Sequence, residues 1–168
     1  MPCVRLSLCL LFILGGAPSL AWAQMFVTTG RDTLRGLPGV EVLVEPLQPE
    51  LEAVGLSTTG LTREVTQQLT AAGVTIYQSQ RENPSSSKPY VYVHVSAVAG
   101  GNGDVAVAIQ LHLRQTLVSL TTESRVVNAM SWDQHSVSVM PLRMLRADIV
   151  EEVRALAARF VADWKAVH

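Results

Sequence analysis

The chain is almost without cysteine, and the two cysteines that it has lie close to its start. Cys3 and Cys9 both fall within the first 23 residues, so the rest of the sequence contains no thiol. This excludes a disulfide framework, a thiolate metal site and a cysteine nucleophile from the body of the protein. A chain of about 145 residues can still bury a core large enough to fold without covalent cross-links.

Long apolar runs are also scarce. The uncharged run from Leu6 to Leu14 is about half of the ~20 residues that a helix needs to cross a bilayer. It follows the basic Arg5 and is followed by two glycines, a proline and the small-residue pattern Ala-Trp-Ala at 21–23. This predicts a secretory signal peptide over residues 1–23. We therefore expect an exported protein, periplasmic or extracellular, that is soluble after cleavage and has no stable membrane anchor.

Neither sign of charge dominates the sequence. The chain has 13 Lys and Arg residues against 14 Asp and Glu residues. Loss of Arg5 with the signal peptide leaves 12 against 14, a net charge of about −2, and no basic stripe or block of like charge occurs. Nucleic acid and anionic membrane surfaces are therefore not expected as partners.

Alternating apolar residues predict the strands. Valine recurs at every second position over 91–95, and apolar residues do the same over 105–113. The sequence Gly-Gly-Asn-Gly at 100–103 lies between these runs and predicts a hairpin. Further strands are expected at Val40–Glu45, at Val74–Tyr77 and from about residue 125 to 139, the last antiparallel to the second hairpin strand.

Two segments have the helical period instead. Leu61, Val65 and Leu69 recur every four residues, and Gly73 marks a C-terminal stop. After Pro141, a longer amphipathic helix is predicted to run to the end of the chain. Its apolar stripe consists of Leu142, Leu145, Ile149, Val153, Leu156, Phe160 and Trp164.

The resulting order, β-α-β-β-β-α, predicts an α+β fold. Two helices with one apolar stripe each are expected to cover one face of a mainly antiparallel sheet, as a two-layer sandwich. We assign residues 1–23 to the signal peptide, 24–38 to a loose N-terminal lead-in and 39–168 to a single α+β domain. The valine-rich side of the hairpin should meet the helices, and the other side should face water or a partner.

This order resembles a group of small modules of the bacterial envelope. A strand ending near Glu45, a helix closed by Ala-Gly-Val at 72–74, three long strands and a terminal amphipathic helix are similar to the two-layer sandwiches of the TolB N-terminal domain, LptE and LpoB. Leu34–Val40 and Leu61–Glu64 also resemble segments of uncharacterised secreted bacterial proteins of similar length. The resemblance covers roughly Val40–Val167 and implies a non-catalytic helper that docks on another envelope component. No functional residue of those families maps onto this sequence, and the lipid-attachment cysteine of LptE and LpoB is missing.

The polar side of the predicted hairpin is the candidate interaction face. It carries Tyr90, Tyr92, His94, Gln110, His112 and Arg114. Tyrosine and arginine are enriched at recognition surfaces, although an ordinary solvated sheet face also favours tyrosine. We therefore expect a soluble exported binding or accessory module, without a cofactor, that docks through an open sheet face or edge on an envelope protein or on a second copy. A purely structural homo-oligomer is an alternative.

A second alternative is a small secreted hydrolase, with or without a metal. It would use His94, His112, His135 and Asp133. A symmetric turn at 100–103 would place His112 opposite Tyr90 and His94 opposite Ala108, so the two imidazoles would be offset along the sheet. Metal ligands must converge on one point, which flat sheet faces rarely allow, and no Gly-x-Ser-x-Gly motif occurs. We therefore assign no catalytic, cofactor-binding or metal-binding residue.

Overall fold

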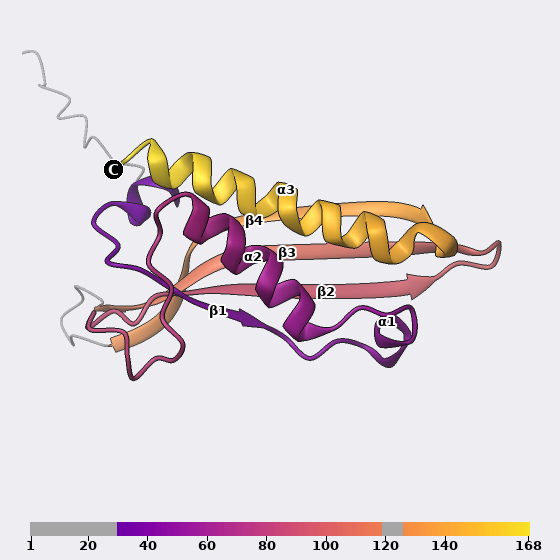
Figure 1. Cartoon of the computed structure of the whole chain (residues 1–168), viewed down its shortest axis with the longest axis horizontal. Helices are drawn as coiled ribbons and strands as arrows, with labels where there is room; N and C mark the ends of the chain where they lie inside the picture. Colours follow the sequence, from indigo (N-terminus) through magenta and orange to yellow (C-terminus); the bar gives the residue numbers. More distant parts are fainter. Residues whose placement is uncertain (1–29, 119–125) are drawn as a thin grey trace, which may run out of the picture.

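The computed structural model describes residues 30–118 and 126–168 and has an α+β fold. Four strands form one open, mixed sheet in the order β1-β2-β3-β4 (Figure 1). The strands are β1 (Glu41–Val44), β2 (Tyr90–Ala99), β3 (Asp104–Val118) and β4 (Val126–Pro141). The helices are α1 (Pro49–Ala53), α2 (Thr58–Ala71) and α3 (Leu145–Lys165), with short 3-10 helices η1 (Gly30–Leu34) and η2 (Leu142–Met144). The predicted signal peptide lies outside the described residues.

The sheet is mainly antiparallel, as predicted. β1 pairs parallel with β2, whereas β2 with β3 and β3 with β4 pair antiparallel. The hairpin between β2 and β3 forms where the glycine-rich sequence predicts it, but its register differs by two residues from that of a symmetric turn. The N–H of Gly100 donates to the carbonyl of Asp104 over 2.7 Å, which brings Tyr92, rather than Tyr90, opposite His112.

The predicted strand at Val74–Tyr77 is wrong as a strand of the sheet. The segment makes only an isolated parallel bridge, between Val40 and Ile76. The chain turns away directly afterwards, because the N–H of Gln78 donates to the carboxylate of Glu82 and the N–H of Glu82 donates to the carbonyl of Ser79. This local turn ends the pairing after one bridge.

The helix α1 was not among the predicted elements. Pro49 stands in its first turn, a position that proline favours. Leu51, in the same helix, is fully buried. Pro49 was the one local sequence signal for a helix here.

The helix α2 begins and ends as its sequence predicts. The hydroxyl of Ser57 accepts the N–H of Gly60 over 3.0 Å, which caps the first turn. Gly73 follows the last turn with a φ of 90°, a conformation that glycine adopts without a steric penalty.

The helix α3 begins later than expected. The three residues after Pro141 form η2, and Leu142, which was assigned to the apolar stripe, is 53% exposed. The stripe is buried from Leu145 to Phe160 and includes Ala157, while Trp164 is only partly buried.

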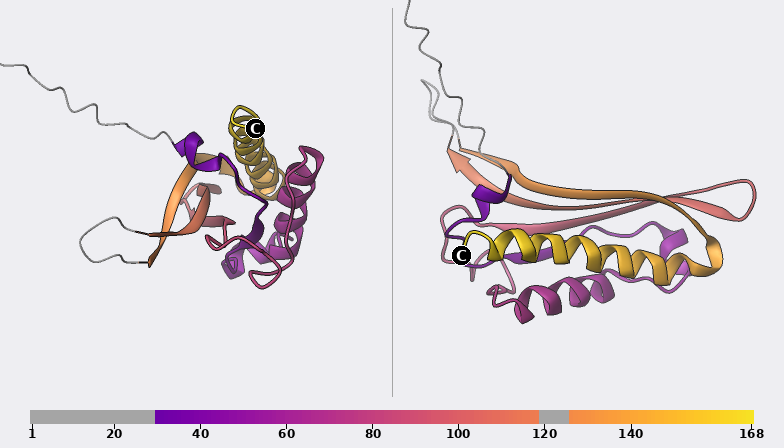
Figure 2. Two further views of the ribbon diagram at one scale, coloured as in Figure 1. Left: turned by 90° about the vertical axis from the view of Figure 1, so that its left-hand side faces the viewer. Right: turned by 90° about the horizontal axis from the view of Figure 1, so that it is seen from above.

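The core lies between the valine-rich side of the sheet and the two long helices, as Figure 2 shows. Trp132 of β4 belongs to this core at 3% exposure. Its indole lies edge-on to Phe160, with ring centroids 5.0 Å apart, and its Nε1–H donates to Asp163 over 3.0 Å. Trp132 therefore fixes β4 to the C-terminal half of α3.

The described part of the expected loose lead-in is packed against the domain. Leu34 is fully buried. The hydroxyl of Thr33 donates to the carbonyl of Ser131 over 2.9 Å, and Arg31 forms an ion pair with Asp163 at 2.8 Å. Ser131 stands where the register between β3 and β4 shifts, so η1 binds β4 at its bulge.

Candidate functional site

Both long helices lie on one side of the sheet, and the described residues leave the other side uncovered (Figure 2). We call this side the open face. Because side chains alternate along a strand, the register identifies which residues it carries. They are Glu41, Leu43 and Glu45 from β1 and the residue after it, Tyr90, Tyr92, His94, Ser96 and Val98 from β2, Ala106, Ala108, Gln110, His112 and Arg114 from β3, and Asp133, His135, Val137 and Val139 from β4.

All six residues of the predicted interaction face lie on the open face. The pairing places Tyr90 opposite Arg114, Tyr92 opposite His112 and His94 opposite Gln110. The two-residue error in the predicted register did not affect this grouping, since a shift of two leaves every side chain on the same side of the sheet.

Glu45 is the organising residue that the sequence analysis missed. Its carboxylate lies 2.5 Å from Nδ1 of His94. It also accepts a hydrogen bond from the hydroxyl of Tyr92, which raises the pKa of that hydroxyl to about 12. The same hydrogen bond, followed by the contact with His94, lowers the pKa of Glu45. Glu45 is therefore an ionised acceptor for two side chains of β2.

His112 is buried rather than facing water, which corrects the expectation for this residue. It is only 8% exposed, because its ring stacks on Tyr92 with centroids 5.1 Å apart and planes 19° from parallel. Burial and the charge of Arg114 lower the pKa of His112, so the imidazole is neutral near pH 7. Its Nε2 has no hydrogen-bond partner among the described residues.

A second polar contact joins three strands at the next row of the face. Nε of Arg114 donates to the side-chain oxygen of Asn128 over 3.0 Å. The hydroxyl of Tyr90 donates to the same oxygen over 3.4 Å. Asn128 on β4 therefore holds one side chain from β2 and one from β3 in place.

The end of the open face nearest the β2–β3 turn is apolar. The register aligns Val98, Ala106 and Val139 in one row across the sheet. Val98 is 71% exposed, Val139 is 69% exposed, and Val137 in the adjoining row is 75% exposed. Neighbouring exposed valines on several strands form a patch rather than scattered surface residues, and such patches mark interaction surfaces.

The arrangement of the histidines does not form a metal centre in the described part of the chain. Gln110 stands between His94 and His135 in the register, and His112 lies one row away. His135 and Asp133 lie 3.8 Å apart, and both are well exposed. Within residues 30–118 and 126–168, no group of three or more histidine, cysteine or acidic side chains could hold a metal ion.

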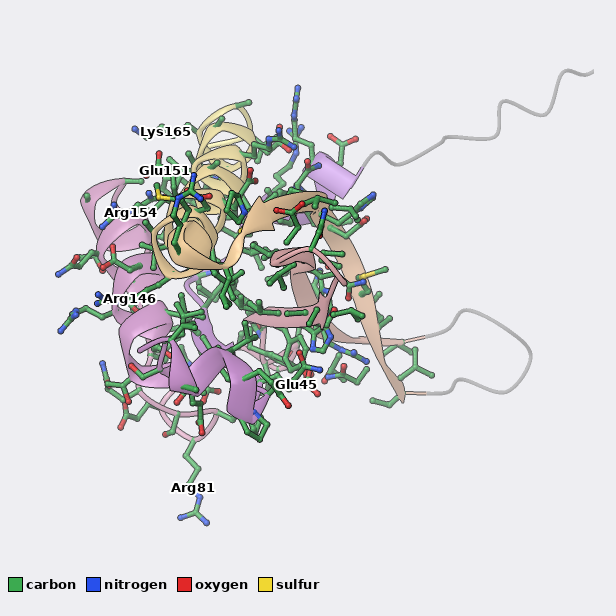
Figure 3. All side chains as sticks on the ribbon, turned by 90° about the vertical axis from the view of Figure 1, so that its right-hand side faces the viewer. Glu45, Arg81, Arg146, Glu151, Arg154 and Lys165 are labelled. Atoms are coloured by element: carbon green, nitrogen blue, oxygen red, sulfur yellow. The ribbon has the colours of Figure 1, made fainter. Side chains whose placement is uncertain are left out.

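Charged residues also gather on the helical side of the molecule, where Figure 3 labels Arg146, Glu151 and Arg154. Arg154 on α3 forms a 2.7 Å ion pair with Glu64 on α2 and lies 3.7 Å from Glu151. The pair with Glu64 bridges the two helices, whereas the contact with Glu151 lies within α3. Among the described residues, no helix is long and apolar enough to cross a membrane.

Comparison with known proteins does not identify a family for this chain. No protein-family model matches it, and no curated protein matches it significantly. Among solved structures, it is similar to a minor lipoprotein from Acinetobacter baumannii, at 9% sequence identity and a TM-score of 0.36. That match covers 77% of this chain and 94% of the lipoprotein chain. Function has to be inferred from the site itself.

Proposed function

We propose that this protein is an exported, non-catalytic accessory module of the cell envelope, which binds another protein through the open face. One observation supports this proposal above all. The polar cluster of Glu45, Tyr92, His94 and His112 adjoins the exposed valine patch on the same flat surface. The export step rests on the signal-peptide pattern at the start of the sequence.

The polar cluster has the properties of a preformed binding surface. Tyr92 is held from one side by Glu45 and from the other by the ring of His112. A side chain that is already fixed loses less conformational entropy when a partner binds. Tyrosine and arginine are also the residue types that carry much of the binding energy at protein interfaces.

The shape of the face favours a protein over a small molecule. A hollow on this face, lined by Gln110, His112, Met130, Asp133, Gln134 and His135, has a volume of about 130 Å³. Pockets for small ligands usually measure about 300–1,000 Å³. A protein surface can cover the whole face instead, with apolar side chains against the valines and hydrogen-bonding groups against the polar cluster.

The test is site-specific photo-crosslinking in cells that export the full chain. A photoreactive residue at Gln110, which is exposed at the centre of the open face, should give one discrete adduct with a foreign protein. The matched control is a probe at Gln67, an exposed residue of α2, which should give none. The absence of any adduct between Gln110 and a foreign protein would contradict the proposal.

Substitution on the face should then remove that adduct. In the double variant Tyr92→Ala and Arg114→Ala, we expect the Gln110 adduct to fall at least about tenfold, since truncation of such anchor residues costs more than about 1 kcal/mol each. Arg154→Ala, which breaks an ion pair on the helical side, should leave it unchanged. Circular dichroism of the purified variants checks that both remain folded.

A further inference from the structure

The outer edge of β4 is a long strand edge that the described residues leave unpaired. β4 is the last strand of the sheet. Its bulge at Ser131 is covered by η1, because Thr33 donates to the Ser131 carbonyl, and Pro141 ends the strand. Between them, no described strand pairs with the outer side of residues 133–139, and this segment carries neither lysine nor proline, which usually protect such edges.

The backbone groups that face outward can be identified from the ladder with β3. The N–H of Leu142 donates to the carbonyl of Gly103, so the even-numbered residues of this part of β4 bond toward β3. The N–H and C=O groups of Asp133, His135, Val137 and Val139 therefore point to the free edge. These groups are available to a further strand.

We propose that two copies of the chain pair antiparallel along this edge, with Ser136 on the twofold axis, and so join their sheets into one. The inference does not rest on the proposed function, because it concerns the edge of the sheet rather than the open face. A twofold axis through Ser136 places Asp133 opposite Val139 of the second copy and His135 opposite its Val137. This register uses the whole unpaired segment and stops short of η1 at both ends.

Two buried hydroxyls support this register. The Oγ atoms of Ser136 and Ser138 are buried, and neither has a hydrogen-bond partner among the described residues. In the paired edge, Ser136 lies opposite Ser136 of the second copy, and Ser138 lies opposite its Gln134. Hydroxyl and amide pairs directly across two strands form hydrogen bonds, so rotation of each buried hydroxyl about χ1 would give it a partner on the second copy.

Charge complementarity on α3 favours a second copy over another kind of strand. α3 lies along β4 in Figure 1. Arg159 of α3 donates to Gln134 over 3.3 Å, whereas Glu152 and Ala155 line a hollow beside Ser138. The register places Gln134 opposite Ser138 of the second copy. Arg159, which is bonded to Gln134, therefore faces Glu152 of the second copy, which lies beside that Ser138. The twofold axis repeats the same contact with the two copies exchanged. The small Ala155 leaves room for the two helices to approach.

A disulfide at the twofold axis tests the register. In the full chain carrying C3S and C9S, Ser136→Cys places two thiols at a non-hydrogen-bonded pair, with Cα atoms about 4.5 Å apart, a separation that allows a disulfide. Mild oxidation should convert most of this variant to a covalent dimer. Asp133→Cys is the control, since its two thiols would lie six residues apart along the strands, about 20 Å. Equal cross-linking of both variants, or none in Ser136→Cys, overturns the proposal.

A second pair of variants tests the edge without a cross-link. Val137→Pro removes an N–H that points away from β3, so the monomer should fold while its association weakens at least tenfold by light scattering. Val137→Thr keeps that N–H and should associate as the wild-type chain does. A wild-type chain that has the mass of one copy at every concentration overturns the proposal. An adduct of Gln110 with a foreign protein tests the open face, whereas the Ser136→Cys cross-link tests the edge, so the two proposals can fail separately.

Discussion

Glu45 shows how one residue outside the predicted set organises the predicted face. Alternation along each strand was enough to group the six face residues, because a side chain's face depends only on its position within its own strand. Glu45 joins them through the parallel pairing of β1 with β2. That pairing links residues about fifty positions apart, and no local pattern in the sequence indicates it. The only sequence signal for this role was that Glu41, Leu43 and Glu45 stand at alternate positions and so share one side of their strand.

The burial of His112 was unpredictable for a similar reason. A histidine at an outward position of a strand is expected to be solvated, and the other imidazoles of the face are more exposed. His112 is covered because Tyr92 lies directly opposite and stacks on it. The exact cross-strand neighbour depends on the turn, which the symmetric interpretation of residues 100–103 misplaced by two residues.

The lowered pKa of His112 has a consequence for stability. Below the ordinary histidine value of 6.5, the unfolded chain takes up a proton at this residue while the folded chain resists doing so. Stability should therefore fall as the pH drops from 7.5 to 5.5. Urea unfolding should show a smaller fall in His112→Gln than in the wild type. His135→Gln, which alters a well-exposed imidazole, is the control, and an identical pH dependence in His112→Gln would contradict the assignment.

At the scale of the elements, the sequence predicted those whose pattern is local. The hairpin, β4, α2 and most of α3 follow from their own periodicity, their caps and their glycines. The short pairing of Val40 with Ile76 does not follow from such local patterns. It stays an isolated bridge because a turn held by Glu82 comes directly after it. The helix α1 has five residues, which is too short for a helical period to be recognised.

The start of β1 depends on a glycine that nothing larger can replace. Gly39 has a φ of 148°, and a Cβ there would lie 2.6 Å from the carbonyl oxygen of Thr75. We expect Gly39→Ala to destabilise the fold by about 3 kcal/mol or more, since both the backbone and the bridge must shift. Gly36→Ala is the matched control: its φ is 70°, but a Cβ there meets nothing within 4 Å. Gly36→Ala should lower the free energy of unfolding by only about 1–2 kcal/mol. Equal losses of stability for the two variants in thermal unfolding would contradict this explanation.

At the scale of the whole molecule, the two layers divide the surface by role. The outer side of the helical layer carries an ion pair that connects α2 with α3. The sheet presents a fixed polar cluster, a valine patch and the long edge of β4, which the described residues leave unpaired. The α+β class and the two-layer arrangement were predictable, because two amphipathic helices can bury their stripes only against the apolar side of the sheet. Which strands form the edges of the sheet was not predictable, since strand order depends on long-range pairing.

The hydrogen bond from Thr33 to Ser131 should affect how the whole chain associates. Thr33→Val keeps the shape of the side chain but removes the donor, which loosens η1 from the bulge of β4. We expect faster growth of thioflavin-positive aggregates on gentle heating, because more of the edge becomes available for pairing. Thr59→Val, an exposed change on α2, serves as the control. Identical aggregation rates in the two variants would show that η1 does not protect the edge.

The bulge at Ser131 and the short helix η1 that covers it therefore limit how far other chains can pair along the edge of β4. A long unprotected strand edge can pair with one chain after another. An edge that is bounded at both ends pairs with a single second strand. Thr33 covers the carbonyl of Ser131, so the edge that is free to pair begins only after the bulge. The difference between a finite assembly and a fibre would then depend on five residues that precede the first strand of the sheet.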